Sequence, residues 1–104
     1  MKVLNIKTIG YQIPSNAVYI GREMYRCELQ RSKWANPFRI GEGCSREASV
    51  ILYRRYIETR ILQDPEIFDI VELYNKDLVC WCAPLSCHGD VLLELIKAQQ
   101  GVVK

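Results

Sequence analysis

Hydrophobic and polar positions divide the chain into short apolar runs and longer stretches with a helical period. Residues 2–8 alternate apolar and polar side chains, apart from Leu4, and this pattern predicts a strand with one buried face. Residues 17–20 and 78–82 are almost entirely apolar, which is typical of interior strands covered on both faces. Residues 10–16 contain Gly, Pro, Ser and Asn and predict a turn.

Three further stretches predict helices. The first helix is expected over residues 46–62, with Ser45 as its N-cap and an apolar side opposite an arginine-rich one. Asp64 and Pro65 mark the start of a shorter helix, as cap and first helical residue, because apolar side chains then recur at i, i+3, i+4 and i+7. A last amphipathic helix is expected over residues 91–101.

This order of elements predicts a compact, Rossmann-like α/β fold. We expect a single domain over residues 1–104, with three helices and a small sheet of three or four strands. A right-handed crossover from the second predicted strand to the third makes the sheet at least partly parallel. Ligands collect at the carboxyl ends of such strands, and both Gly21-Arg22 and residues 82–90 follow one. We therefore expect these two segments to meet at a common site.

Composition narrows the function classes. The 104 residues, 49% hydrophobic and 25% charged, suit one globular domain. The net charge of +2 is too balanced to predict a coat of nucleic acid, and glutamates are interleaved with the basic residues of segment 22–47. No stretch approaches the roughly 20 apolar residues that span a bilayer, and the five cysteines are an odd number. We expect a cytoplasmic protein (host cytoplasm if phage-encoded) that binds a small molecule, not a membrane or a nucleic-acid polymer.

Residues 80–90 concentrate three cysteines, the only histidine and an aspartate directly before the last predicted helix. Cys87 beside His88 is a candidate nucleophile, because the positive end of a helix favours a thiolate. Asp90 could orient His88, act as a general base or cap the helix. Gly89 is assigned to ligand binding. The alternative is that His88 only fixes the loop.

The same segment offers four zinc ligands of the right number and softness, namely Cys80, Cys82, Cys87 and His88. The first two would share a strand face, but adjacent cysteine and histidine side chains rarely turn toward one ion. The usual paired-knuckle spacing is also missing, and strand cysteines are often small buried side chains. A non-enzymatic zinc-binding or interaction module is therefore an alternative, whereas the leading interpretation requires no cofactor.

A second constellation lies in the long loop after residue 20. A glycine after a strand lets the backbone approach a ligand, arginine and lysine suit a phosphate, and an indole can stack on a base. Asn36 stands before Pro37, which restricts it to extended geometry and fixes its amide for reading a base or for closing the loop. Core packing is the alternative for the indole. The residues assigned to ligand binding here are Gly21, Arg22, Lys33, Trp34 and Asn36.

Three separated motifs resemble a known family. They are VYIGR at 18–22, SKWANPF at 32–38, and CWCAP at 80–84 with CHGDVL at 87–92. From about residue 14 to 96 the chain is similar to the family catalogued as domain of unknown function 4326, which is common in bacteria and bacteriophages. The family has no settled activity, so the resemblance implies relatedness and no particular reaction.

The leading hypothesis is a protein that binds a nucleotide, nucleoside or similar phosphorylated metabolite between residues 21–38 and 87–90. Arg22 and Lys33 would hold the anion, and His88 with Asp90 would transfer protons if the protein is a hydrolase or transferase. A phage or bacterial accessory protein that sequesters a nucleotide without turnover is the other alternative. The oligomeric state is left open.

Overall fold

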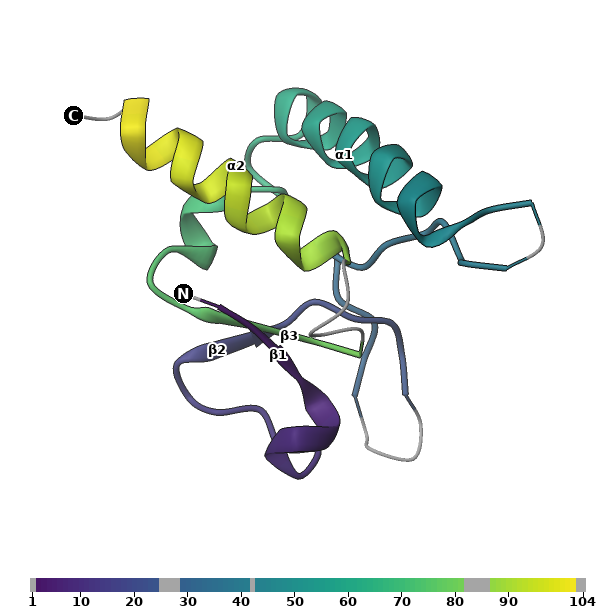
Figure 1. Cartoon of the computed structure of the whole chain (residues 1–104). Coiled ribbons are helices and arrows are strands. Elements are labelled where there is room, and N and C mark those ends of the chain that lie inside the picture. Colours follow the sequence, from purple (N-terminus) through teal and green to yellow (C-terminus); the bar gives the residue numbers. More distant parts are fainter. Residues whose placement is uncertain (1, 25–28, 42, 82–86, 103–104) are drawn as a thin grey trace.

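The computed structural model describes residues 2–24, 29–41, 43–81 and 87–102 (Figure 1). Within these residues, three short strands form one sheet in the order β1-β3-β2, and both outer strands run parallel to β3. The small α/β domain with a parallel sheet is thereby confirmed. The strands are β1 (Val3–Asn5), β2 (Ala17–Tyr19) and β3 (Asp77–Cys80).

The predicted first strand ends early. After β1 the chain forms one 3-10 turn, η1 (Ile6–Ile9). The Asn5 side chain caps this turn, because its Oδ1 accepts the backbone N–H of Lys7 at 2.9 Å. Gly10 closes the turn in the left-handed region, with φ 69°. The turn buries Ile6 completely. The apolar residue at position 6, which the alternating pattern of residues 2–8 assigned to a strand, is therefore buried by a 3-10 turn.

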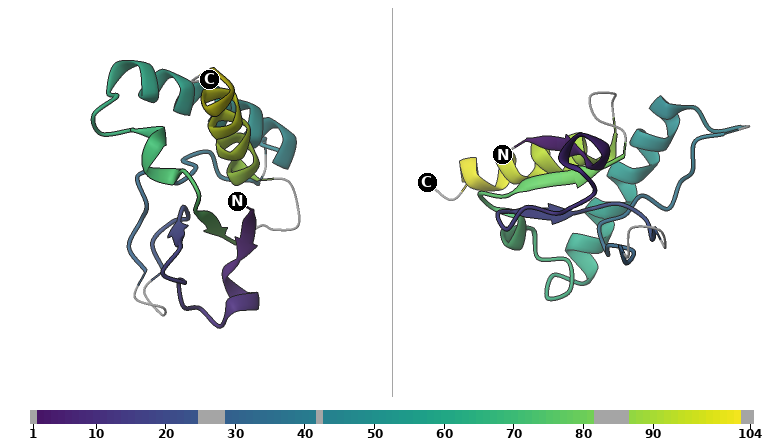
Figure 2. Two further views of the ribbon diagram at one scale, coloured as in Figure 1. Left: turned by 90° about the vertical axis from the view of Figure 1, so that its left-hand side faces the viewer. Right: turned by 90° about the horizontal axis from the view of Figure 1, so that it is seen from below.

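Two α-helices lie on the same side of the sheet, as Figure 1 and the left view of Figure 2 show. The first, α1 (Arg46–Gln63), begins as predicted, with Ser45 Oγ accepting the N–H of Ala48 at 3.1 Å. The second, α2 (His88–Val102), starts three residues before the predicted position. It contacts both β3 and α1.

The prediction of a third helix from Asp64 is wrong. Asp64 caps the carboxyl end of α1, where its N–H reaches Arg60 O at 2.8 Å. Only one 3-10 turn, η3 (Ile70–Leu73), follows, and Asp69 caps it. Ile70 and Leu73 are buried whereas Val71 is exposed, and this spacing of three suits the tighter 3-10 turn.

The core centres on β3, as expected for an interior strand. Leu78 and Val79 are completely buried. Leu78 packs in one cluster with Leu92 of α2 and Ile57 of α1, and Val79, the next residue of the strand, points to the opposite face of the sheet. No helix in the described part of the chain is long and apolar enough to cross a bilayer.

Candidate functional site

A cavity of about 430 Å³ lies where β2 and β3 end. Five segments line it: residues 21–22 after β2, parts of the loop 31–40, the first turns of α1, residues 80–81 at the end of β3, and residues 87–88 at the start of α2. The structure thus brings together five of the residues that the sequence assigned to a site. These are Gly21, Arg22, Asn36, Cys87 and His88.

The charge of the cavity wall is one-sided. Four arginines line it, and no aspartate or glutamate is present among its described lining residues. Glu23 and Glu47, which lie close in sequence, are exposed and outside this lining. Among the described residues of segment 22–47, arginines therefore line the cavity and glutamates do not. The four are Arg22, Arg31, Arg39 and Arg46.

Three of these arginines are exposed, namely Arg22, Arg31 and Arg39. Within the part of the chain that the structure describes, no carboxylate forms an ion pair with Arg22, Arg31 or Arg39. Exposed arginines with no anionic partner raise the positive potential of the cavity. The interleaved glutamates gave no indication in the sequence that these arginines would line one cavity.

Gly21 lies in close contact with the Tyr19 side chain. A Cβ at this position would lie 2.6 Å from the Tyr19 hydroxyl oxygen. That hydroxyl donates to Arg22 O at 2.5 Å and accepts the indole N–H of Trp81 at 2.8 Å. Gly21 therefore leaves room for a hydrogen-bonded bridge between the ends of β2 and β3, at one side of the cavity.

Asn36 closes its own loop. Its Oδ1 accepts the N–H of Phe38 at 2.9 Å, and its Nδ2 donates to Ser49 Oγ at 2.9 Å. The Ser49 hydroxyl in turn donates to Phe38 O at 2.5 Å. Of the two uses that the sequence left open for this amide, these contacts show loop closure. They fasten the loop wall of the cavity to α1.

His88 joins the start of α2 to the end of β2. The side chain is 7% exposed, and its Nε2–H donates to the carbonyl oxygen of Ile20 at 2.7 Å. The ring also meets Tyr53 edge-on, with 5.0 Å between the ring centroids. Since the carbonyl occupies Nε2, proton transfer by His88 would have to use Nδ1.

Tyr53 supports this arrangement from α1. Burial first, and then the neighbouring Tyr56 and Cys87, raise the pKa of Tyr53 well above its ordinary value. The hydroxyl is therefore protonated at neutral pH, and it donates to Trp34 O at 2.7 Å.

Cys87 and Asp90 cap α2 in a reciprocal arrangement. Cys87 Sγ accepts the N–H of Gly89 at 3.3 Å, and Asp90 Oδ2 accepts the N–H of Cys87 at 3.1 Å. Asp90 is exposed and lies outside the cavity lining, so its observed contact is the capping one. Gly89 also lies outside the lining; a Cβ there would come within 3.0–3.1 Å of Val3 and Ile20.

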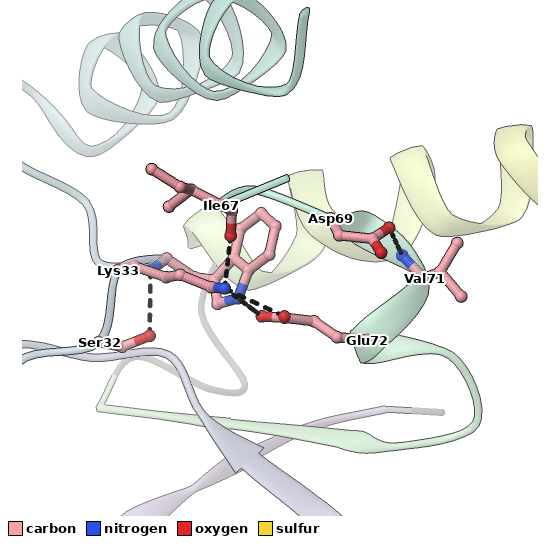
Figure 3. A network of polar contacts seen from close by, with 7 residues as sticks. Ser32, Lys33, Ile67, Asp69, Val71 and Glu72 are labelled. Atoms are coloured by element: carbon pink, nitrogen blue, oxygen red, sulfur yellow. Dashed lines mark hydrogen bonds and ion pairs between the residues drawn. The ribbon is translucent and has the colours of Figure 1, made fainter. Parts of the chain in front are cut away.

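Lys33 and Trp34 lie outside the cavity lining, and both contact Glu72 of η3. Figure 3 shows Lys33 pointing toward Glu72 and Ile67. Lys33 Nζ lies 2.9 Å from a carboxylate oxygen of Glu72 and also donates to Ile67 O. The Trp34 indole N–H donates to Glu72 Oε1 at 2.8 Å, and the side chain is only 1% exposed. Core packing is thus what the structure shows for Trp34, and an ion pair with Glu72 is what it shows for Lys33.

The matches to known proteins agree with the motifs in the sequence. A family model described as Domain of unknown function (DUF4326) matches residues 4–98. The chain belongs to the DUF4326 family. It is also 40% identical, over 90 residues, to an uncharacterized protein of Acanthamoeba polyphaga mimivirus; the match covers 77% of this chain and 66% of that protein, just under two thirds of its length. No solved structure matches the chain.

The three DUF4326 motifs converge in space. Residues 21–22, 35–38 and the pair 80–81 with 87–88 come from different motifs, and all line the cavity. The relative just described comes from a mimivirus, so a bacterial or phage origin for this chain stays a prediction.

The zinc alternative concerns a set of four residues, of which Cys82 lies outside the described residues. Cys80 and Cys87 are in contact, with 3.4 Å between their Sγ atoms. His88 Nε2 is taken by the Ile20 carbonyl. In the described ranges no three side chains of the ligand types are grouped to hold a metal ion.

Proposed function

We propose that this DUF4326 domain binds a phosphorylated small molecule of the nucleotide class in the cavity at the carboxyl ends of β2 and β3. The observation that carries the proposal is the set of four arginines on a cavity whose described lining has no carboxylate. Guanidinium groups match phosphate oxygens with paired, charge-assisted hydrogen bonds. A cavity with an acidic or neutral wall would offer phosphate no such match.

The size and place of the cavity favour a small ligand. Its volume of about 430 Å³ falls in the range of roughly 300–1,000 Å³ that small-molecule sites occupy. In open parallel sheets, ligands bind beyond the carboxyl ends of the strands, where this cavity lies. The proposed domain is Rossmann-like and cytoplasmic, and its partner is a metabolite.

Apolar side chains that could receive a base stand beside the arginines. Phe38 and Trp81 are half-buried and both line the cavity. Phe38 packs edge-on against Tyr56, with 6.0 Å between centroids, and Trp81 is held by its hydrogen bond to Tyr19. Rings fixed in this way lose little freedom when a planar base packs on them.

Binding is the function that the contacts support best, and turnover is a separate test. Asp90 already accepts a helix N–H, and His88 has one nitrogen engaged with a carbonyl. Incubation with each bound nucleotide followed by product analysis separates sequestration from hydrolysis or transfer.

The test is calorimetric titration with nucleoside mono-, di- and triphosphates, sugar phosphates, pyrophosphate and unphosphorylated nucleosides. A charge-assisted hydrogen bond contributes about 1.5–3 kcal/mol, so Arg39→Ala should weaken binding of the best phosphorylated compound about 10- to 100-fold. Arg55→Ala is the matched control, because Arg55 is exposed on α1 outside the cavity. If both variants bind as the parent does, or if nucleosides bind as well as nucleotides, the proposal is wrong.

A further inference from the structure

We propose that Cys80 and Cys87 are a redox-active dithiol that exchanges reversibly with low-molecular-weight disulfides of the glutathione type. The inference stands apart from phosphate binding. Their Sγ atoms are in contact, 3.4 Å apart. Cys80 is 1% exposed and Cys87 4%.

Regular structure on both sides brings the two thiols together. Cys80 is the last residue of β3, where it pairs in register with Asn5 of β1. Cys87 is the residue before α2, fixed by the reciprocal cap with Asp90. A disulfide has an S–S length of about 2.05 Å, so bond formation requires an approach of roughly 1.4 Å from the observed contact.

Cys87 is the thiol placed to attack. Its Sγ accepts the N–H of Gly89 at 3.3 Å, at the positive end of α2. The same cavity wall carries four arginines. A helix N-terminus stabilises a thiolate, which is the reactive form, and the positive potential of the cavity acts in the same direction. Cys80, in contact with this sulfur, is then the resolving thiol.

We propose that the disulfide reaches the two cysteines through the cavity. Both cysteines are among its lining residues, although each is almost fully buried. Glutathione carries carboxylates, and the arginines of the wall favour the entry of such an anion.

The exchange balances in two steps. The Cys87 thiolate attacks one sulfur of glutathione disulfide, so that a protein–glutathione disulfide forms and one glutathione thiolate leaves. Cys80 loses its proton and attacks Cys87 Sγ, which forms the Cys80–Cys87 bond and releases the second glutathione thiolate. The protein loses two electrons and two protons, and one glutathione disulfide becomes two glutathione molecules.

The experiment uses the full chain with Cys27, Cys44 and Cys82 replaced by serine. It is equilibrated in buffers of reduced and oxidised glutathione, quenched with an alkylating reagent and weighed by mass spectrometry. We expect both thiols to disappear together, with no bound glutathione at equilibrium. The matched control keeps Cys44 and Cys87 and has serine at the other three cysteine positions, Cys80 included. Because it lacks the resolving thiol, it should accumulate glutathione adducts.

A comparison in denaturant shows whether the fold is responsible. The exchange constant of the Cys80–Cys87 protein should be at least tenfold larger in native buffer than in denaturant, because the folded chain holds the sulfurs in contact. Equal constants in a variant that circular dichroism shows to be folded, or persistent glutathione adducts, would overturn the inference. If the triple variant does not fold, a Cys27→Ser/Cys44→Ser chain replaces it. Fragment masses of that chain then decide whether Cys80 pairs with Cys87 or with Cys82; pairing with Cys82 overturns the inference.

Discussion

Removal of the Tyr53 hydroxyl tests how the hydrogen bond between α1 and the loop at Trp34 stabilises the fold. Tyr53 is completely buried, and its hydroxyl donates to Trp34 O at 2.7 Å. Tyr53→Phe keeps the ring but leaves this carbonyl without the phenol donor, and Trp34 is only 1% exposed. Loss of one partner from a buried hydrogen bond costs about 1–3 kcal/mol. For a domain of this size, a loss of about 2 kcal/mol lowers Tm by about 8–16 °C.

The same variant predicts a pH effect. Burial raises the pKa of Tyr53 in the folded state, whereas the unfolded chain titrates near 10.0. The unfolded state therefore releases its proton first, and the parent protein loses stability as pH rises above about 10, by up to about 1.4 kcal/mol per pH unit from this group. Tyr53→Phe lacks this contribution, so the stability gap between parent and variant should narrow above pH 10.

Urea unfolding of parent and variant between pH 7 and pH 11, followed by circular dichroism, measures both effects. Tyr56→Phe is the control: it removes a hydroxyl from the same helix at a half-buried position with no hydrogen bond among the described contacts. We expect this control to stay within about 0.5 kcal/mol of the parent. A Tyr53→Phe protein equally stable at pH 7, or a gap that does not change above pH 10, would refute the reasoning.

Substitutions at three further positions have expected outcomes. The buried Tyr74 hydroxyl has no hydrogen-bond partner among the described residues, so Tyr74→Phe should raise the free energy of unfolding, by about 1 kcal/mol in the same urea assay. Asp90→Ala removes the acceptor for the Cys87 N–H and should cost about 1 kcal/mol, whereas Asp90→Asn should recover part of it. Gly21→Ala should displace the Tyr19 hydroxyl. The free energy of nucleotide binding, measured by calorimetry, should fall by more than the free energy of unfolding, measured from Tm. Unchanged affinity would contradict the close contact.

Local patterns were sufficient for the elements with strong local signals. The apolar run before Gly21 and the N-cap at Ser45 predicted β2 and α1, because burial on both faces and a capping hydroxyl act within a few residues. The segment after Asp64 was harder. Its apolar stripe fits an α-helix and a 3-10 turn equally near Ile70, and the choice depends on packing against the rest of the fold.

The site shows a similar limit of local reasoning. Lys33 and Trp34 lie close in sequence to the cavity residue Asn36, but Glu72 holds both of them, and this carboxylate lies almost forty residues further along the chain. The gathering of Arg31, Arg39 and Arg46 is likewise a product of tertiary structure. Nothing in an alternating run of basic and acidic residues states which sign will face a cavity.

The account depends on the cavity being an anion site, and nuclear magnetic resonance tests this directly. Titration of the labelled chain with adenosine diphosphate should shift the backbone amides of Arg22, Arg39 and His88, which line the cavity from three different segments. The amide of Leu62, exposed near the far end of α1, should not move. Shifts confined to surfaces outside the cavity, or none at millimolar nucleotide, would contradict the proposed site.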